Sequence, residues 1–131
     1  MEIRPYSVKD EAQLFDMMRE EGTEWECYYD DAVIEKYKLA LSTSIVCVAC
    51  EGDVLCGYLR CRDDDGFGVY VYDLLVRKTY RGGHIGRSLI EYICAKYPED
   101  TVYVMSDVDE YYEKQGFVRE GSIFKCQIGS K

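Results

Sequence analysis

The chain has 131 residues, a net charge of −9 and a hydrophobic fraction of 47%, which predicts a single globular domain over residues 1–131 and excludes a disordered segment. Its acidic excess lies in the first half, and it has no basic face of any size, so the composition argues against a nucleic-acid partner. No apolar run approaches the roughly 20 residues that a bilayer span requires, which argues against a membrane partner.

The first half of the sequence predicts one strand and two helices. Residues 2–6 are expected to form a short strand. Asp10 can cap a helix that runs to about Glu20, where Gly22 interrupts it. The second helix, which Asp30 or Asp31 would cap, is indicated by apolar residues at helical spacing: Ile34, Tyr37 and Leu41.

From Ser44 onward the pattern becomes rich in strands. Two β-prone runs joined by a short turn predict a hairpin, and a third strand follows, in which alternation would place Val69, Val71 and Asp73 on one side. A helix from about Ile85 to Tyr97, a strand, a short helix ended by Gly116 and two further strands complete the chain. The order β-α-α-β-β-β-α-β-α-β-β predicts an α/β domain of the α+β type, with a mixed, mostly antiparallel central sheet flanked by helices. The last two expected strands cover residues 117–121 and 122–128.

The chain contains seven cysteines and one histidine. The odd number of cysteines and the single histidine argue against a disulfide framework and a zinc site, so no metal is expected. Four cysteines lie in apolar, β-prone surroundings, which favours buried, reduced thiols in a cytoplasmic protein: Cys47, Cys50, Cys56 and Cys61.

The stretch TYRGGHIGRSL, residues 79–89, joins the third long strand to a helix. Its glycines and the helix N-terminus would direct several backbone N–H groups toward one anion, which the helix dipole also attracts. Arg81 and Arg87 could pair with phosphate oxygens. The glycine spacing matches neither of the two common nucleotide loops. A simple turn with solubilising arginines is the alternative.

Together with the preceding strand and the later segment YYEKQGF, residues 111–117, this loop resembles the GNAT superfamily of acetyl-CoA-dependent N-acetyltransferases. The signature loop of that family is Q/R-x-x-G-x-G/A between a strand and a helix, and its second signature is an aromatic-Tyr-x-x-x-Gly-Phe segment. The resemblance in element order covers nearly the whole chain. One position departs from the family pattern, because His84 stands where the first loop glycine is expected.

The resemblance implies acetyl-CoA as cosubstrate, with pantetheine along the third strand and pyrophosphate on the loop. His84 would then need a positive φ, a region in which histidine is enriched among non-glycine residues. Its side chain could donate to a phosphate, or could make no ligand contact at all. The implied cosubstrate-binding residues are Leu74, Leu75, Val76, Arg81, Gly82, Gly83, His84, Ile85, Gly86 and Arg87.

The resemblance also implies a general acid. Attack of an amine on a thioester expels a thiolate, which a phenol of pKa about 10 can protonate. Tyr112 occupies the tyrosine position of the second signature, and Tyr111 is its neighbouring rival. The general base stays open between Asp73, Asp107 and a chain of water molecules.

Residues 20–31, EEGTEWECYYDD, would wall the acceptor groove according to the same resemblance. Carboxylates interleaved with aromatic rings suit a primary amine or another cation, although an acidic loop with buried aromatics has the same composition. The candidate acceptor-binding residues are Glu24, Trp25, Glu26 and Tyr29.

The sequence therefore predicts an N-acetyltransferase that moves acetyl from acetyl-CoA to a primary amine by direct attack in a ternary complex. The acceptor would be a cationic small amine or a protein amino group. Two alternatives stay open, a catalytically silent coenzyme A-binding regulator and a non-enzymatic acidic interaction module. The sequence leaves the oligomeric state undecided.

Overall fold

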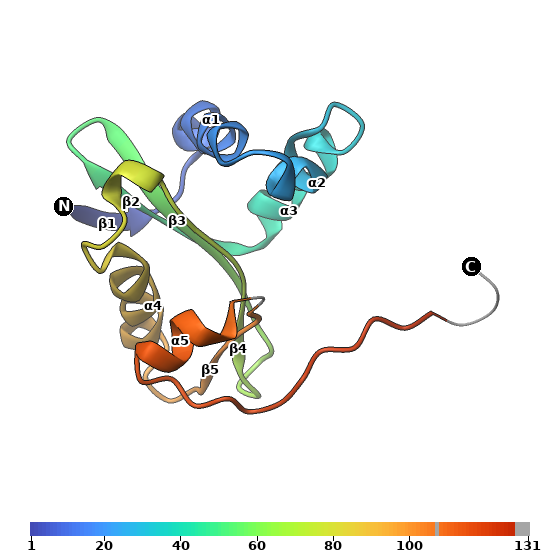
Figure 1. The fold of residues 1–131 in the computed structure, drawn as a ribbon, viewed down its shortest axis with the longest axis vertical. Coiled ribbons are helices and arrows are strands. Elements are labelled where there is room, and N and C mark those ends of the chain that lie inside the picture. Colours follow the sequence, from blue (N-terminus) through green and yellow to red (C-terminus); the bar gives the residue numbers. More distant parts are fainter. Residues whose placement is uncertain (107, 128–131) are drawn as a thin grey trace.

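The computed structural model describes residues 1–106 and 108–127. Five strands form one sheet in the order β1-β2-β3-β4-β5, in which β4 and β5 run parallel and all other neighbours run antiparallel. Helices α1, α2 and α3 cover one face of this sheet, and α4 and α5 cover the other (Figure 1). The elements are β1 (Glu2–Pro5), α1 (Glu11–Glu21), α2 (Glu26–Tyr29), α3 (Ile34–Thr43), β2 (Ile45–Glu51), β3 (Val54–Asp63), β4 (Val69–Val76), α4 (Ile85–Lys96), β5 (Val102–Val104) and α5 (Asp109–Lys114).

The core is divided by the sheet into two apolar clusters. Leu14, Met17 and Met18 of α1 pack with Tyr37 of α3 on one face, whereas Leu89 and its α4 neighbours pack on the other. The helical spacing that predicted these elements therefore marks their buried sides, because each helix has a single sheet face to cover. The predicted fold class is confirmed.

Two local expectations about the N-terminal helices change. Asp10 lies at the start of α1, but its carboxylate accepts the Arg4 guanidinium at 2.8 Å and the Ser7 amide at 2.9 Å instead of capping α1. The short helix α2 was not expected, since four residues are too few for a periodic pattern to be visible.

A β-bulge in β4 changes which residues face which side. Arg60 of β3 lies opposite Asp73, but its neighbour Cys61 lies opposite Val71, so Tyr72 is an extra residue. An extra residue shifts the two-residue alternation of a strand by one. Val71 consequently faces α4 while Asp73 faces α1–α3, and the expectation that both lie on one side is wrong.

The sheet separates between β4 and β5. Pairing covers three residues of each strand and ends at Val71 and Val104, with one more hydrogen bond from the Met105 amide to the Val71 carbonyl at 2.9 Å. Strand β4 continues to Val76 without β5 beside it. From Tyr72 to Val76, the edge of β4 opposite β3 therefore has no neighbouring strand.

The two expected C-terminal strands are absent from described residues 117–127; Ile128 lies outside the described part. This segment leaves the sheet and runs away from it (Figure 1). It borders a groove of about 810 Å³ beside β5, and it leaves the side chains of Val118 and Phe124 largely exposed. A β-prone sequence forms a strand only when it pairs with a neighbouring strand, and here the segment pairs with none.

Cysteine positions agree with the sequence expectation. Cys47, Cys50, Cys56 and Cys61 are buried, and all are free thiols. Cys47 and Cys50 are separated by two residues, yet they pack in different clusters on opposite faces of the sheet, so they do not form a dithiol pair. Within the described residues, no helix has the length and apolar character needed to span a bilayer.

Candidate active site

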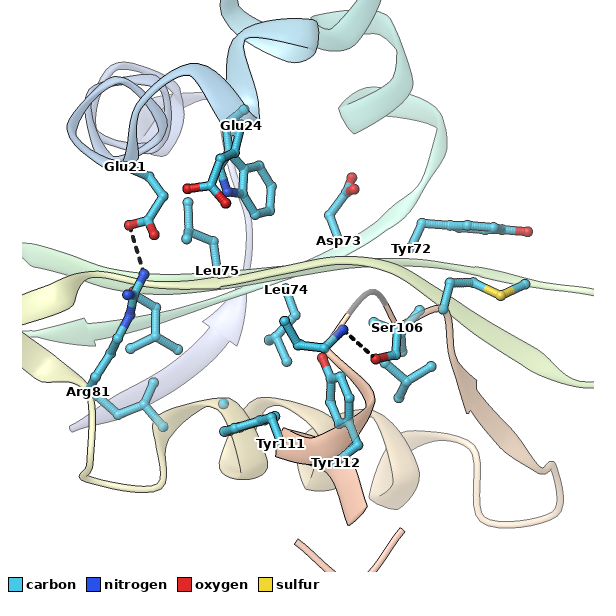
Figure 2. Close-up of a pocket in the computed structure, with 18 of the residues that line it drawn as sticks. Glu21, Glu24, Tyr72, Asp73, Leu74, Leu75, Arg81, Ser106, Tyr111 and Tyr112 are labelled. Carbon is cyan, nitrogen blue, oxygen red and sulfur yellow. Dashed lines mark hydrogen bonds and ion pairs between the residues drawn. The ribbon is translucent and has the colours of Figure 1, made fainter. Parts of the chain in front are cut away.

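A cavity of about 830 Å³ opens where β4 and β5 separate. Its walls come from the end of α1 and from α2 above the sheet, from β4 in the middle, and from the loop before α4 and from α5 below (Figure 2). The separation of the strands thus joins a space on the α1–α3 face to a space on the α4 face. A long, narrow ligand could pass through the sheet plane at this point.

The loop before α4 places His84 in the positive-φ conformation that was expected from the sequence. His84 has φ 63° and ψ 21°, in the left-handed region, which confirms the sequence expectation. The first hydrogen bond of the helix runs from the Ser88 amide to the His84 carbonyl at 2.9 Å. The amides of Ile85, Gly86 and Arg87 precede it and have no partner within the helix, so they are donors suited to an anion.

Gly86 makes a close contact in this first turn. A Cβ atom at this position would lie 2.9 Å from the Tyr111 hydroxyl and 3.7 Å from side-chain atoms of Leu74 and Val76. The absence of a side chain therefore lets α5 approach the N-terminus of α4. Gly82 and His84 also line the cavity, whereas Gly83 does not.

The two arginines expected at a phosphate behave differently. Arg81 lines the cavity, donates from Nε to the Val76 carbonyl at 2.9 Å and forms an ion pair with Glu21 at 2.7 Å (Figure 2). Arg87 does not line it, because its guanidinium donates to the Gln115 carbonyl at 2.9 Å. Only Arg81 is thus placed to meet an anion in this cavity.

Both tyrosines of α5 line the cavity, at different depths. The Tyr111 hydroxyl lies over Gly86, in the first turn of α4. Tyr112 instead rises toward β4 and the place where the strands separate, beside Ser106 (Figure 2). Its ring stacks on Phe117, with centroids 5.8 Å apart and an interplanar angle of 15°. The Gly-Phe part of the second signature thereby holds the tyrosine in place.

Asp73 lines the cavity, yet its carboxylate is held by three donors of the protein itself. Oδ2 accepts from Arg60 Nε and from the Tyr37 hydroxyl, both at 2.6 Å, and Oδ1 accepts from the Tyr28 hydroxyl at 2.7 Å. The side chain is 3% exposed. Most of the acceptor sites of this carboxylate are therefore occupied, and the geometry does not support the base assignment. Asp107, the other candidate, lies outside the described residues.

On the acceptor side, the structure brings together half of the expected set. Glu24 and Trp25 line the cavity, whereas Glu26 and Tyr29 do not. Tyr29 donates instead to the Gly22 carbonyl at 3.2 Å. Tyr28 was missed, although it stands three residues after Trp25, the spacing that places two side chains on one face of a helix.

The remaining cavity residues extend the expected set in a simple way. Leu74, Leu75 and Val76 line it as expected, together with Ile85. Residues at and just after the end of β5 were not anticipated, because no local pattern marks where the two strands separate: Val104, Met105, Ser106 and Val108. No cluster of three or more potential metal ligands occurs among the described residues.

The two sequence signatures implied an acetyltransferase-like fold. The mixed sheet that opens beside the N-terminus of α4 is consistent with that class of fold. A family model described as an acetyltransferase (GNAT) domain matches residues 42–119, which is more than half of the chain. The chain belongs to the GNAT acetyltransferase family.

Relatives and solved structures agree with this assignment. The chain is 24% identical over 97 residues to the uncharacterized N-acetyltransferase ycf52 of Pyropia yezoensis, covering 66% of this chain and 56% of that protein. It therefore spans about half the length of this curated relative. A GNAT family acetyltransferase of Streptococcus pneumoniae matches with TM-score 0.70 and 23% identity over 96% of this chain and 98% of that one.

An aminoglycoside 6'-N-acetyltransferase solved in complex with coenzyme A has TM-score 0.65 and 19% identity, covering 88% of this chain and 73% of that one. At these identities the likeness of both solved structures concerns the fold.

Proposed function

We propose that this protein transfers an acetyl group from acetyl-CoA to a primary amine by direct attack in a ternary complex. The observation that carries the proposal is the cavity at the β4–β5 separation, which runs from the N-terminus of α4 to an acidic, aromatic wall formed by residues 21–28, at the end of α1 and in α2. A cosubstrate with an anionic end and a slender thioester arm suits the part of the cavity beside α4 and α5. An amine suits the part beside α1 and α2.

The residues present fit acetyl-CoA in three respects. The amides at the start of α4 and the Arg81 guanidinium offer donors to a pyrophosphate. The backbone of β4 from Asp73 to Val76, which has no β5 partner, offers hydrogen bonds to an amide-containing arm. Leu74 and Val104 provide apolar surface along the way. The acetyl thioester supplies the electrophilic carbonyl carbon.

Tyr112 is proposed to act as the general acid. The bound ammonium first loses one proton to water, which gives the neutral amine. The amine nitrogen then forms a bond to the carbonyl carbon, the carbon–sulfur bond breaks, and the thiolate takes the Tyr112 proton. The amide product forms as the amine nitrogen loses one proton to water, and this proton restores the phenol. Tyr112 is favoured over Tyr111 because its side chain lies at the strand separation, while Tyr111 lies near the anion-binding turn.

The acceptor is proposed to be cationic. The charge of Asp73 is neutralised by Arg60, and Glu21 is paired with Arg81. Glu24 lines the cavity beside Trp25 and forms no ion pair with any residue that the structure describes. A carboxylate next to an aromatic ring is a suitable site for an ammonium group.

Thiol release from acetyl-CoA tests the activity, with a panel of monoamines, polyamines, aminoglycosides and lysine peptides. Turnover with at least one amine, and none with a matched alcohol, is the expected result. Calorimetric binding of acetyl-CoA without turnover would instead indicate a coenzyme A-binding regulator. The absence of both would contradict the proposed function and favour an interaction module.

A further inference from the structure

Tyr28 and Asp73 form a hydrogen bond within the cavity wall, which both residues line. The Tyr28 hydroxyl donates to Asp73 Oδ1 at 2.7 Å, from α2 across to β4. The Tyr28 ring also stacks on Tyr37, with centroids 4.2 Å apart and an interplanar angle of 25°. Since both ends of the side chain are held, its hydroxyl has a fixed position in the wall.

Asp73 is itself held from three directions. Arg60 and Tyr37 donate to its second oxygen, and the Tyr37 hydroxyl shares a hydrogen bond of 2.8 Å with the Tyr58 hydroxyl. The Arg60 guanidinium carbon lies 5.4 Å from the Tyr37 ring centroid, a cation–π distance. The carboxylate thus keeps its orientation, because moving it would break several hydrogen bonds at once.

The direction of the Tyr28 proton decides what the hydroxyl can recognise. A phenol has one proton to donate and two lone pairs to accept with. The proton is committed to Asp73, so only acceptor capacity is left toward the cavity, which Tyr28 lines. Burial, and then the hydrogen bond to Asp73, raise the pKa of Tyr28 well above its usual value of 10, so the group stays neutral at physiological pH.

We propose that the Tyr28 hydroxyl oxygen accepts a hydrogen bond from the amine of the acceptor, and that Asp73 is the positioning residue that fixes Tyr28 for this role. This inference rests on the proposed function. It requires an acceptor whose nitrogen has an N–H group to donate to Tyr28, as a primary amine does. The Trp25 ring lies alongside, with its centroid 5.8 Å from that of Tyr28. The positioning role also separates Asp73 from the proton-transfer steps.

The decisive variant is Tyr28→Phe, which keeps the ring and removes the acceptor oxygen. We expect the KM for the amine to rise about tenfold, as the loss of one hydrogen bond predicts, with kcat and acetyl-CoA affinity changed less than twofold. Tyr29→Phe is the matched control, since Tyr29 bonds the Gly22 carbonyl away from the cavity; its KM should stay at the wild-type value. An unchanged KM in Tyr28→Phe would overturn the inference.

A second variant tests Asp73 without leaving Arg60 as a buried, unpaired charge. The double change Asp73→Asn with Arg60→Gln removes both charges together, and its thermal transition should stay cooperative. We expect turnover to persist, with a raised KM for the amine and the wild-type pH profile of kcat. Loss of turnover, or loss of the acidic limb of that profile, would identify Asp73 as the base instead.

Wild-type turnover is measured first, so that failure of the Tyr28 inference can be distinguished from failure of the proposed function. Turnover in the wild type with an unchanged KM in Tyr28→Phe would refute the role of Tyr28 alone. No turnover with any amine would refute the proposed function and this inference together. Should Tyr28→Phe not fold, the KM of the double variant decides the outcome, because it alters the anchor and keeps the Tyr28 hydroxyl.

Discussion

The Arg81 guanidinium lies 2.7 Å from the Glu21 carboxylate, so an ion pair joins the end of α1 to the loop before α4. Next to it, Arg77 pairs with Glu20. The residue best placed to meet an anionic ligand is therefore already bound to a carboxylate of its own chain. Binding of a pyrophosphate would have to compete with Glu21 for this guanidinium or bring three charged groups together.

Replacement of Glu21 should accordingly strengthen cosubstrate binding. We expect Glu21→Gln to lower the dissociation constant of coenzyme A about threefold at low salt, because one repulsive carboxylate is removed from the site. Titration calorimetry at two ionic strengths measures the effect, which should shrink as salt is added. Glu20→Gln is the control, as Arg77 does not line the cavity; an equal gain there would argue against a local effect.

Tyr112→Phe should separate chemistry from binding. Loss of a general acid is expected to lower kcat about 100-fold, the lower end of the usual range for acid catalysis, while coenzyme A affinity stays within twofold. Pre-steady-state thiol release and calorimetry give the two quantities. Tyr111→Phe should retain kcat within a few-fold; the reverse ranking would transfer the acid role to Tyr111.

Gly57 should be intolerant of even one methyl group. Its Cβ would lie 2.9 Å from the backbone carbonyl oxygen of Leu75 and 3.4 Å from a Leu89 side-chain atom. We expect Gly57→Ala to lower the free energy of unfolding by about 1–3 kcal/mol through overpacking, measured by urea denaturation. Gly121→Ala, with nothing within 4 Å, should change it by less than about 0.5 kcal/mol.

His84 tests whether the loop uses a side chain or only a backbone conformation. At φ 63°, glycine is favoured over every L residue. We expect His84→Gly to keep coenzyme A affinity within twofold, and the β-branched His84→Val to weaken it about tenfold by distorting the turn. Equal losses in both variants would show that the imidazole itself contacts the ligand.

Asp10 should make stability depend on pH in the acidic range. The hydrogen bonds from the Arg4 guanidinium, the largest cause, hold the pKa of this buried carboxyl below its usual value. A lowered pKa in the folded state contributes stability above the unfolded value of about 3.9, and this stability is lost as the pH falls through the folded value. The free energy of unfolding should therefore decrease as the pH is lowered from about 5 toward 2.

Asp10→Asn checks this prediction by denaturation at a series of pH values. The variant should be less stable at pH 7 and should show a shallower decrease in the acidic range. Asp16→Asn is the control, because the Asp16–Arg19 pair is exposed and such pairs contribute little. An acidic limb of wild-type steepness in Asp10→Asn would assign it to other carboxyls.

Much of the fold and the conformation of the turn before α4 could be predicted because their signals are local. Helical spacing, glycine positions and the two signatures each lie within a dozen or so residues, so the positive φ of His84 and the place of Tyr112 beside the cavity could be expected without knowledge of distant contacts. The position of Asp73 could not. Its partners Tyr28, Tyr37 and Arg60 come from α2, α3 and β3, and the bulge at Tyr72 reverses the side that simple alternation predicts.

The C-terminal segment was wrongly predicted because a local pattern suggested strands that have no pairing partner among the described residues. Residues 117–127 have the composition of strands, yet strand formation requires a partner edge, which composition does not report. Only two of the four residues predicted to bind the acceptor line the cavity, for a related reason. Acidic and aromatic residues define the chemistry of the cavity wall, but only the rotation of α2 decides that Tyr28, and not Tyr29, faces the cavity.

The short pairing between β4 and β5 has a consequence for how the molecule opens. Three residue pairs connect β5 to the rest of the sheet, and α5 with Tyr112 follows directly along the chain. Elements secured by so few hydrogen bonds exchange their amide protons through local opening well before global unfolding. Residues 102–106 and 108–116 should therefore exchange faster than β2 and β3 in the free protein. A ligand that bridges β4 and α5 would slow that exchange, so Tyr112, the proposed general acid, would become rigid only once the cosubstrate is in place.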